Sequence, residues 1–215
     1  SARRRMDAET LVRPGSTSKL FTWTAVMQLV EQGKISLDAD VNQYIDFKIP
    51  AFDGKPVTVR NLLTHTTGFE ESLKNLISEE GNELPGFDAL LKEHVPARIF
   101  APGTTPAYSN YGASLAGYIV QRVSGMSFDD YVEKHIFAPL GMNSTTFRQP
   151  LPADWKPRIS TSNKDASHPP RKFELVGAAP AGSVSTTASD MARFMIAHLQ
   201  QGKYGEAQIL RPETV

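Results

Sequence analysis

The 215-residue sequence predicts a helix-rich domain with little that could form a large sheet. Three observations favour this fold class. Apolar residues recur at helical spacing in several segments, glycine or proline follows most of these segments, and the polar stretch 150–180 is proline-rich and only weakly periodic. No internal repeat is visible and no linker cleanly divides the chain, so we expect a single domain over residues 1–215.

The first expected helix follows Ser16 and is the most apolar of the chain. Leu20, Met27 and Val30 recur at helical spacing, and further apolar residues cover its other faces. A helix that is apolar on so many sides is expected in the centre of the fold. Gly33 provides its stop.

Shorter helices are expected along the rest of the chain, several of them behind a capping residue. Thr58, Ser127 and Thr187 can each accept a backbone hydrogen bond at a helix start. The expected helices lie at residues 41–45, 58–64, 87–94, 110–123, 127–136 and 187–201, and short strands are expected at 172–176 and 209–210. The domain thus divides into a frayed lead-in (1–15), a helical region (16–149), a loop-rich insertion (150–186) and a helix with a terminal segment (187–215).

The composition excludes several functional classes. The 23 basic and 23 acidic residues balance, and a pI near 7.0 gives no electrostatic case for binding nucleic acid. Cysteine is absent, which excludes disulfides and thiol catalysis, and the histidines lack metal-binding spacing, so we expect no metal. No phosphate loop or dinucleotide motif occurs, so we expect no cofactor. The run Arg3-Arg4-Arg5 is expected to be a solvated terminal segment, and no apolar run approaches the ~18–20 residues of a membrane span.

Ser16 and Lys19 form a Ser-x-x-Lys step where a loop becomes the first helix. Residues i and i+3 share a helix face, so the hydroxyl and the amine can touch. A neutral lysine can take the proton of a serine nucleophile, and burial and the positive end of the helix dipole both disfavour a charged lysine. The alternative is an N-cap serine followed by a solvated lysine, which is the commoner meaning of such a step.

A Tyr-x-Asn step, Tyr108-Ser109-Asn110, stands just before another expected helix. The sequence contains one such step and one Ser-x-x-Lys step, which favours a shared role. The alternative is that Tyr108 is a packing residue with a wet hydroxyl and Asn110 a plain N-cap. His65 is expected to be structural, holding the turn before Gly68, and Gly182 is expected to be a tight-turn residue.

Five segments carry a resemblance to a known family. They are residues 15–21 (GSTSKLF), 62–69 (LLTHTTGF), 108–112 (YSNYG), 139–142 (PLGM) and 181–186 (AGSVST). In order, and over nearly the whole chain, they resemble the class C-like branch of the serine β-lactamase and penicillin-binding-protein superfamily. The resemblance implies an α+β (α/β) fold of the β-lactamase/transpeptidase type, of which this chain would be a helix-rich portion with an incomplete antiparallel sheet.

The resemblance also implies an acyl-transfer mechanism and roles for four residues. Ser16 would be the nucleophile that forms an acyl-enzyme, and Lys19 and Tyr108 would share its proton. Tyr108 would later activate water or protonate the leaving group. Asn110 would orient Lys19 and bind the substrate's amide, and the backbone N–H of Ser16 would supply half of the oxyanion hole.

The family's third motif, Lys-Thr-Gly or His-x-Gly on a closing strand, does not occur in this sequence. We therefore expect an internal fragment that is weakly active or inactive by itself, because a second oxyanion donor would be missing. The expected function is a serine hydrolase of carboxypeptidase, D-aminopeptidase, esterase or β-lactamase type, acting on a small-molecule or peptidoglycan-peptide substrate. The alternative is a non-catalytic, penicillin-binding-like binding or regulatory module. Members of the family are usually exported, which points to the periplasm or cell envelope, and the sequence leaves the oligomeric state open.

Overall fold

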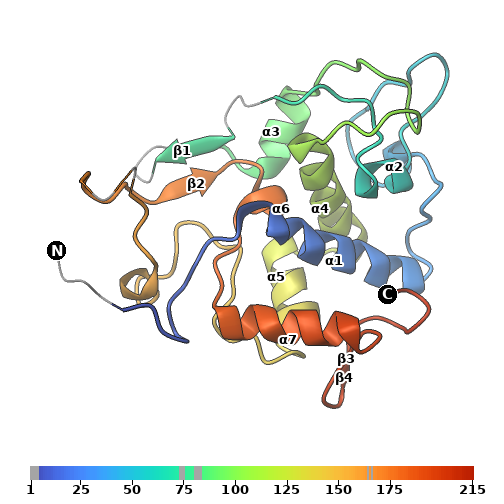
Figure 1. Cartoon of the computed structure of the whole chain (residues 1–215). Helices are drawn as coiled ribbons and strands as arrows, with labels where there is room; N and C mark the ends of the chain where they lie inside the picture. Colours follow the sequence, from blue (N-terminus) through green and yellow to red (C-terminus); the bar gives the residue numbers. More distant parts are fainter. Residues whose placement is uncertain (1–4, 73–75, 80–83, 164, 166) are drawn as a thin grey trace.

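The computed structural model describes residues 5–72, 76–79, 84–163, 165 and 167–215 (Figure 1). Its α-helices are α1 (Lys19–Glu31), α2 (Val59–Leu63), α3 (Phe87–Glu93), α4 (Asn110–Ser124), α5 (Phe128–Val132), α6 (Ala179–Gly182) and α7 (Ala188–Leu199). Single helical turns of other types are η1 (Gly15–Ser18), η2 (Val41–Gln43), η3 (Glu133–Phe137) and η4 (Lys156–Arg158). The strands are β1 (Ile77–Glu79), β2 (Glu174–Val176), β3 (Lys203–Tyr204) and β4 (Ala207–Gln208).

Helix α1 runs through the centre of the molecule, as its apolar surface predicts (Figure 1). It packs against α4 on one side, and α7 runs beside it on another. The ring of Phe21 is completely buried and lies 4.2 Å from that of Phe194 on α7, measured between centroids. The helix ends at Glu31, and Gly33 takes up the left-handed conformation (φ 69°) that turns the chain away.

The predicted caps are confirmed. The side chains of Thr58, Ser127 and Thr187 each accept a hydrogen bond from the backbone three residues on, at the starts of α2, α5 and α7. Within the described ranges, a reciprocal capping box forms only at Thr58, where the Asn61 side chain accepts from the backbone N–H of Thr58. These caps satisfy first-turn N–H groups that would otherwise lack partners.

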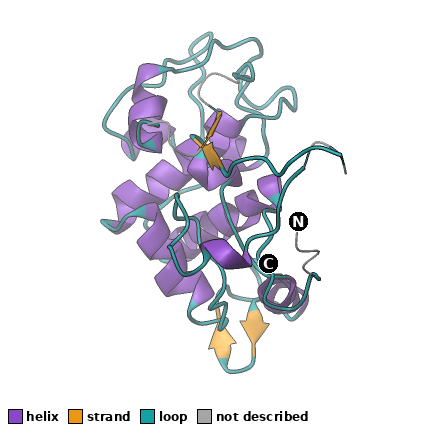
Figure 2. Cartoon of the chain, turned by 90° about the vertical axis from the view of Figure 1, so that its left-hand side faces the viewer, coloured by secondary structure: helices purple, strands orange, loops and turns teal. Residues whose placement is uncertain are grey.

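The strands form two small antiparallel pairs. Strand β2 falls inside the predicted 172–176 segment and pairs with β1 in the register Ile77↔Val176. The strand predicted at 209–210 is wrong. The strand there is β4, which forms a hairpin with β3 around Gly205 (φ 58°), and Ile209 and Leu210 lie beyond it with their side chains buried in the core. Their apolar character reflects burial rather than strand pairing. Figure 2 shows this hairpin extending from the helical body.

Two predicted helices differ in detail from the structure. The 127–136 helix is split into α5 and the π-helical turn η3, which buries both Ile136 and Phe137. The 41–45 helix is a single 3-10 turn, Val41–Gln43. Among the described residues, no helix has the length and apolarity needed to cross a membrane. Of the basic run 3–5, only Arg5 lies in the described part, and it is exposed.

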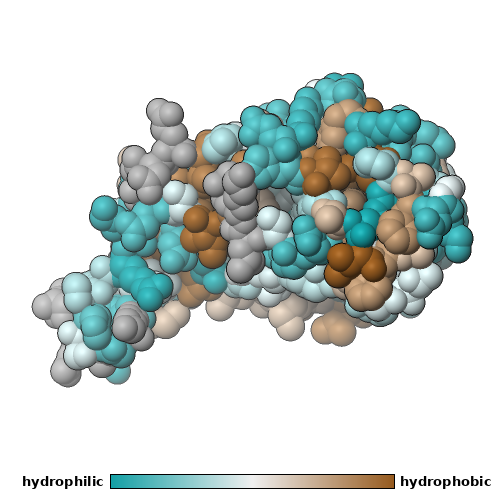
Figure 3. Space-filling model, turned by 90° about the horizontal axis from the view of Figure 1, so that it is seen from above, coloured by the Kyte–Doolittle hydropathy of each residue, from teal (hydrophilic) through white to brown (hydrophobic). Residues whose placement is uncertain are grey.

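Close packing between α4 and α6 brings the two motif segments together. A Cβ atom added at Gly117 on α4 would lie 2.5 Å from Cβ of Pro180 on α6, so the absence of a side chain allows this approach. Helix α6 also packs against η1. The start of α1, the start of α4 and the end of α6 therefore meet at one place. From above, the surface is largely hydrophilic and is interrupted by a few apolar patches (Figure 3).

Candidate active site

Ser16 lies in a 3-10 turn that runs directly into α1. Gly15 begins this turn with a positive φ of 58°, a conformation that glycine adopts without strain. In a 3-10 turn, residues i and i+3 eclipse each other. The amine of Lys19 accordingly lies 3.1 Å from the hydroxyl oxygen of Ser16. The sequence-based expectation that these two groups touch is confirmed.

Lys19 is buried, with only 4% of its surface exposed. Its amine donates hydrogen bonds to Ser16 Oγ, to Asn110 Oδ1 at 2.8 Å and to the backbone oxygen of Ala181 at 2.8 Å. The alternative of a solvated lysine is therefore wrong. Three acceptors match the three N–H groups of the charged amine, whereas a neutral amine would keep two donors and turn its lone pair toward the serine proton.

Tyr108 completes a three-residue hydrogen-bonded group. Its hydroxyl donates to Ser16 Oγ at 2.7 Å, although the two residues are 92 positions apart. The Tyr108 side chain is no buried packing residue, since the residue is 48% exposed. Its ring packs against that of His65, with 4.5 Å between centroids and a tilt of 33°, and Lys19 Nζ lies 4.7 Å from the Tyr108 ring centroid. The ring is thus held at the edge of the cleft with its hydroxyl directed at Ser16.

Asn110 is the first residue of α4 and not its cap. The cap is Ser109, whose hydroxyl accepts from the backbone N–H of Gly112, so the plain N-cap interpretation of Asn110 is wrong. The Asn110 amide oxygen faces Lys19, and its Nδ2 donates to Glu71 Oε1 at 2.7 Å. Glu71 Oε2 also accepts from the Asn110 backbone N–H at 3.0 Å. Sequence reasoning missed Glu71, because an exposed glutamate outside any motif carries no signal.

His65 supports the segment that carries Tyr108. Its carbonyl accepts from the backbone N–H of Ala107, and its Nδ1 accepts from that of Ser109 at 3.2 Å. A ring nitrogen that accepts cannot carry a proton, so the imidazole is neutral. Burial lowers the pKa of His65, the charge of Lys19 lowers it further, and Glu71 opposes both. These bonds agree with the structural role predicted for this residue.

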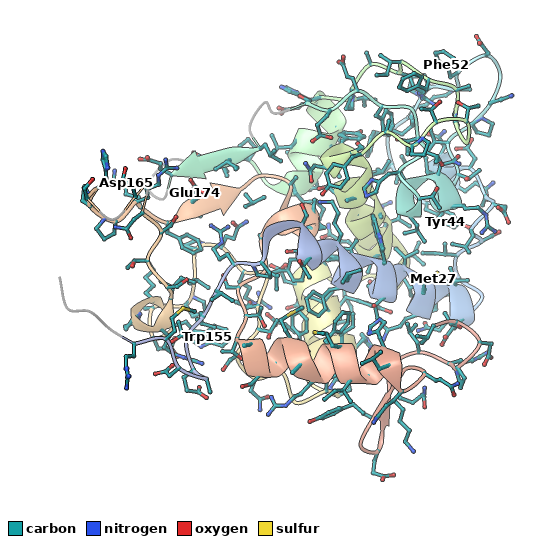
Figure 4. All side chains as sticks on the ribbon, in the orientation of Figure 1. Met27, Tyr44, Phe52, Trp155, Asp165 and Glu174 are labelled. Atoms are coloured by element: carbon teal, nitrogen blue, oxygen red, sulfur yellow. The ribbon has the colours of Figure 1, made fainter. Side chains whose placement is uncertain are left out.

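Two of the four motif residues, Ser16 and Asn110, line a cleft of about 250 Å³. Ser16 and Asn110 lie in its wall with Gly182, which ends the short helix α6 rather than forming a left-handed turn. Arg13 and Glu174 also line the cleft, and the Arg13 guanidinium lies 4.4 Å from the centroid of Phe173 and donates to the backbone oxygen of Glu174. Burial lowers the pKa of Arg13. Figure 4 labels Glu174 on β2, on the other side of the molecule from Met27.

Comparisons with known proteins agree on one family. The family model described as Beta-lactamase matches residues 1–215. The D-alanyl-D-alanine-carboxypeptidase/endopeptidase AmpH of Escherichia coli is 29% identical over 204 residues, which is 93% of this chain and 52% of AmpH.

Solved structures lead to the same family. An octameric penicillin-binding protein homologue from Pyrococcus abyssi superposes with a TM-score of 0.82 at 29% identity, over 99% of this chain and 49% of that one. A class C beta lactamase gives a TM-score of 0.73 at 29% identity, over 93% of this chain and 54% of that one. The chain spans about half the length of these relatives. The chain belongs to the Beta-lactamase family and has the β-lactamase/transpeptidase-like fold, here helix-rich with small antiparallel sheets.

Proposed function

We propose that this protein is a serine hydrolase that transfers an acyl group to Ser16. One observation carries the proposal: the Ser16 hydroxyl oxygen lies within hydrogen-bond distance of both the Lys19 amine (3.1 Å) and the Tyr108 hydroxyl (2.7 Å). A serine is a poor nucleophile until a neighbouring base takes its proton. Two groups that can accept and return that proton stand beside it.

In the proposed first half-reaction, Ser16 Oγ bonds to the carbonyl carbon of the substrate and its proton passes to the neutral form of the Lys19 amine. The bond from the carbonyl carbon to the leaving group then breaks, and Tyr108 protonates the departing atom. The product is an acyl-enzyme ester on Ser16. In the second half-reaction the Tyr108 phenolate takes a proton from water, and the hydroxide adds to the carbonyl carbon of the ester. The bond from that carbon to Ser16 Oγ then breaks, the acid is released, and Ser16 takes its proton back from Lys19.

Asn110 and the backbone complete the proposed site. Asn110 holds Lys19 through its amide oxygen and lies in the cleft wall, where it can meet the amide of a bound substrate. The backbone N–H of Ser16 is proposed to donate to the developing oxyanion, a contribution that in other serine hydrolases is worth about 10²–10³ in rate per donor.

The proposed substrates are esters or amides of small molecules and of peptidoglycan peptides. The names of relatives support this class, because AmpH is a D-alanyl-D-alanine-carboxypeptidase/endopeptidase. We favour a peptidase or esterase over a β-lactam-resistance enzyme, and a place in the periplasm or cell envelope. The fold alone does not decide the substrate, because one fold serves several reactions.

Covalent labelling of the protein tests the proposal, because it registers even a single slow turnover. A fluorophosphonate and benzylpenicillin are each expected to add one mass increment to the chain, located on Ser16 by peptide mapping. Ser16→Ala should abolish the adduct, and Ser36→Ala, which changes another exposed serine, should not. Labelling elsewhere in the chain contradicts the proposal, and the absence of any adduct favours a non-catalytic binding module.

A further inference from the structure

A second cavity adjoins strand β2 and the starts of α3 and α5, and its volume is about 520 Å³. Leu175 of β2 lies in its wall, whereas the preceding residue, Glu174, lines the cleft that contains Ser16. Neighbouring residues of a strand point to opposite faces, so β2 separates the two spaces, and Val176 at its end borders both. Small-molecule sites have volumes of ~300–1,000 Å³, so this cavity can hold a ligand of its own.

Three phenylalanines form an aromatic part of the cavity wall. Phe128 and Phe147 are both buried, and their rings meet edge to face with 5.1 Å between centroids. Phe87 of α3 meets Phe128 in the same way at 6.4 Å. Aromatic rings favour the hydrocarbon part of a ligand, and their faces also attract a cation.

The charged side chains in this wall are both carboxylates, those of Asp88 and Asp129. Neither has a hydrogen bond or an ion pair with the described residues. The nearby Arg148 donates its hydrogen bonds to Asp130 and Glu133 and not to Asp129. Burial raises the pKa of Asp129, Arg148 opposes this rise, and Glu133 and Asp130 add to it. The wall therefore carries negative charge that a bound cation would neutralise.

A purely structural explanation of the two aspartates is also available. Asp88 lies in the first turn of α3 and Asp129 in the first turn of α5, where a helix favours a carboxylate. In that case each carboxylate stabilises its helix and has no effect on a molecule in the cavity. The two explanations make different predictions for ligand affinity.

We infer that this cavity is a binding site for an apolar ligand that carries one ammonium group, separate from the cleft of Ser16. The hydrocarbon part of the ligand packs against Phe87 and Phe128. Its ammonium group pairs with Asp129, and Asp88 adds to the negative potential of the wall. The inference does not depend on the proposed acylation of Ser16.

Two probes that share one skeleton test the charge preference: 4-phenylbutylammonium and the neutral 4-phenylbutan-1-ol. Each is titrated into the whole chain at about pH 7.5, and the amide signals are followed by NMR. Both probes should shift the signals of Asp129 and Leu175. The ammonium probe should bind about tenfold more tightly, as a charge-assisted hydrogen bond in place of a neutral one implies. Equal affinities overturn the inference, and so do shifts confined to Gly15 and Ser16.

Asparagine at the two acidic positions keeps the shape of the side chain and removes its charge. We expect Asp129→Asn to weaken binding of the ammonium probe about fivefold and Asp88→Asn about twofold, while the affinity for the alcohol stays unchanged. Glu93→Gln is the matched control, because Glu93 is an exposed carboxylate of α3 outside the cavity wall. It should bind both probes like the wild type. If Asp129→Asn changes only the midpoint of urea unfolding, the structural explanation holds and the inference fails.

Ser16→Ala separates this site from the proposed active site. The variant should bind the ammonium probe with the wild-type affinity, because Ser16 does not line this cavity. This result is expected whether or not Ser16 reacts with a fluorophosphonate, so failure of the proposed function leaves the test intact. Loss of binding in Ser16→Ala would place the probe in the cleft and overturn the inference.

Discussion

Glu71 holds Asn110 with both of its carboxylate oxygens, one on the side-chain Nδ2 at 2.7 Å and one on the backbone N–H at 3.0 Å. An asparagine amide can face either way, but a carboxylate only accepts hydrogen bonds. Glu71 therefore requires Nδ2 on its own side and directs Oδ1 toward Lys19, where it accepts from the amine. An exposed carboxylate outside any motif thus fixes the orientation of a motif residue.

Replacing Glu71 should slow the proposed acylation without unfolding the protein. In Glu71→Ala the Asn110 amide is free to turn, and we expect the rate of Ser16 labelling to fall about tenfold, as the loss of a charge-assisted hydrogen bond implies. Glu71→Gln keeps one acceptor and should recover part of the rate. The control is Glu70→Ala, which removes the exposed neighbouring glutamate. Equal rates in the Glu71 and Glu70 variants would refute this role.

Tyr108→Phe should separate the hydroxyl from the ring. The ring stacks on His65 and stays in place, while the hydrogen bond to Ser16 is lost. Because positioned proton transfer typically contributes about 10²–10⁴ in rate, we expect acylation of Ser16 to drop by about that factor. The midpoint of urea unfolding should stay unchanged, since Tyr108 is half-exposed. Tyr204→Phe, in the β3–β4 hairpin, serves as control and should label at the wild-type rate.

Because of His65, we expect the folded protein to lose stability in acid. Its pKa is lowered from the ordinary 6.5 in the folded protein, chiefly by burial, so below that value the unfolded chain binds the proton more readily. The free energy of unfolding should therefore fall as the pH drops through about 6.5 and stop falling below the folded pKa. Protonation would also displace the Ser109 N–H from Nδ1.

His65→Asn is a suitable variant for measuring this effect. Asparagine tolerates the positive φ of 53° at this position and offers an acceptor oxygen, but it does not titrate. Urea unfolding at about pH 7.5 and about pH 5 should show a smaller difference for the variant than for the wild type. His135, whose pKa is also lowered, is present in both proteins and cancels from the comparison. Identical differences would show that His65 contributes nothing.

Two glycines of α4 should respond in opposite ways to alanine. A Cβ at position 117 would clash with the ring of Pro180, so we expect Gly117→Ala to lower the free energy of unfolding by about 1–3 kcal/mol. It should also slow acylation, because α6 carries the Ala181 carbonyl that accepts from Lys19. At position 112 the nearest atoms lie at 3.5 Å or beyond, and Gly112→Ala should be neutral or stabilising by up to about 1 kcal/mol. Unfolding in urea measures both, and equal effects would contradict the packing argument.

Local chemistry made much of the fold predictable. A capping threonine or serine and a terminating glycine each act within one turn, so the starts at Thr58 and Thr187 and the stop at Gly33 follow from neighbouring residues. The meeting of Ser16 and Lys19 is likewise local. That Tyr108 and Asn110 join them came from the resemblance to a family rather than from spacing.

Other features depend on contacts that no local pattern encodes. Strand β1 forms because Ile77 pairs with Val176, which lies 99 positions further along the chain. A segment of three residues is too short for an alternating pattern to predict it as a strand. The π-helical turn after α5 accompanies the burial of Phe137 against Phe21 of α1. This is a contact between segments far apart in the sequence, so the local pattern does not reveal it. The contact between Glu71 and Asn110 forms only when the 65–72 segment and the start of α4 are brought together in the fold.

The Lys19 amine bonds to three points of the chain that are far apart in the sequence or in different elements, at Ser16, Asn110 and Ala181. The proposed chemistry and the architecture both depend on this amine, whereas only the proposed chemistry depends on the serine beside it. A descendant of this protein could lose the proposed activity by changing Ser16 and keep its fold at little cost in stability. A descendant that lost Lys19 would leave the groups around Asn110 and Ala181 without their buried hydrogen-bond partner. We therefore expect relatives that have lost the proposed activity to retain this lysine.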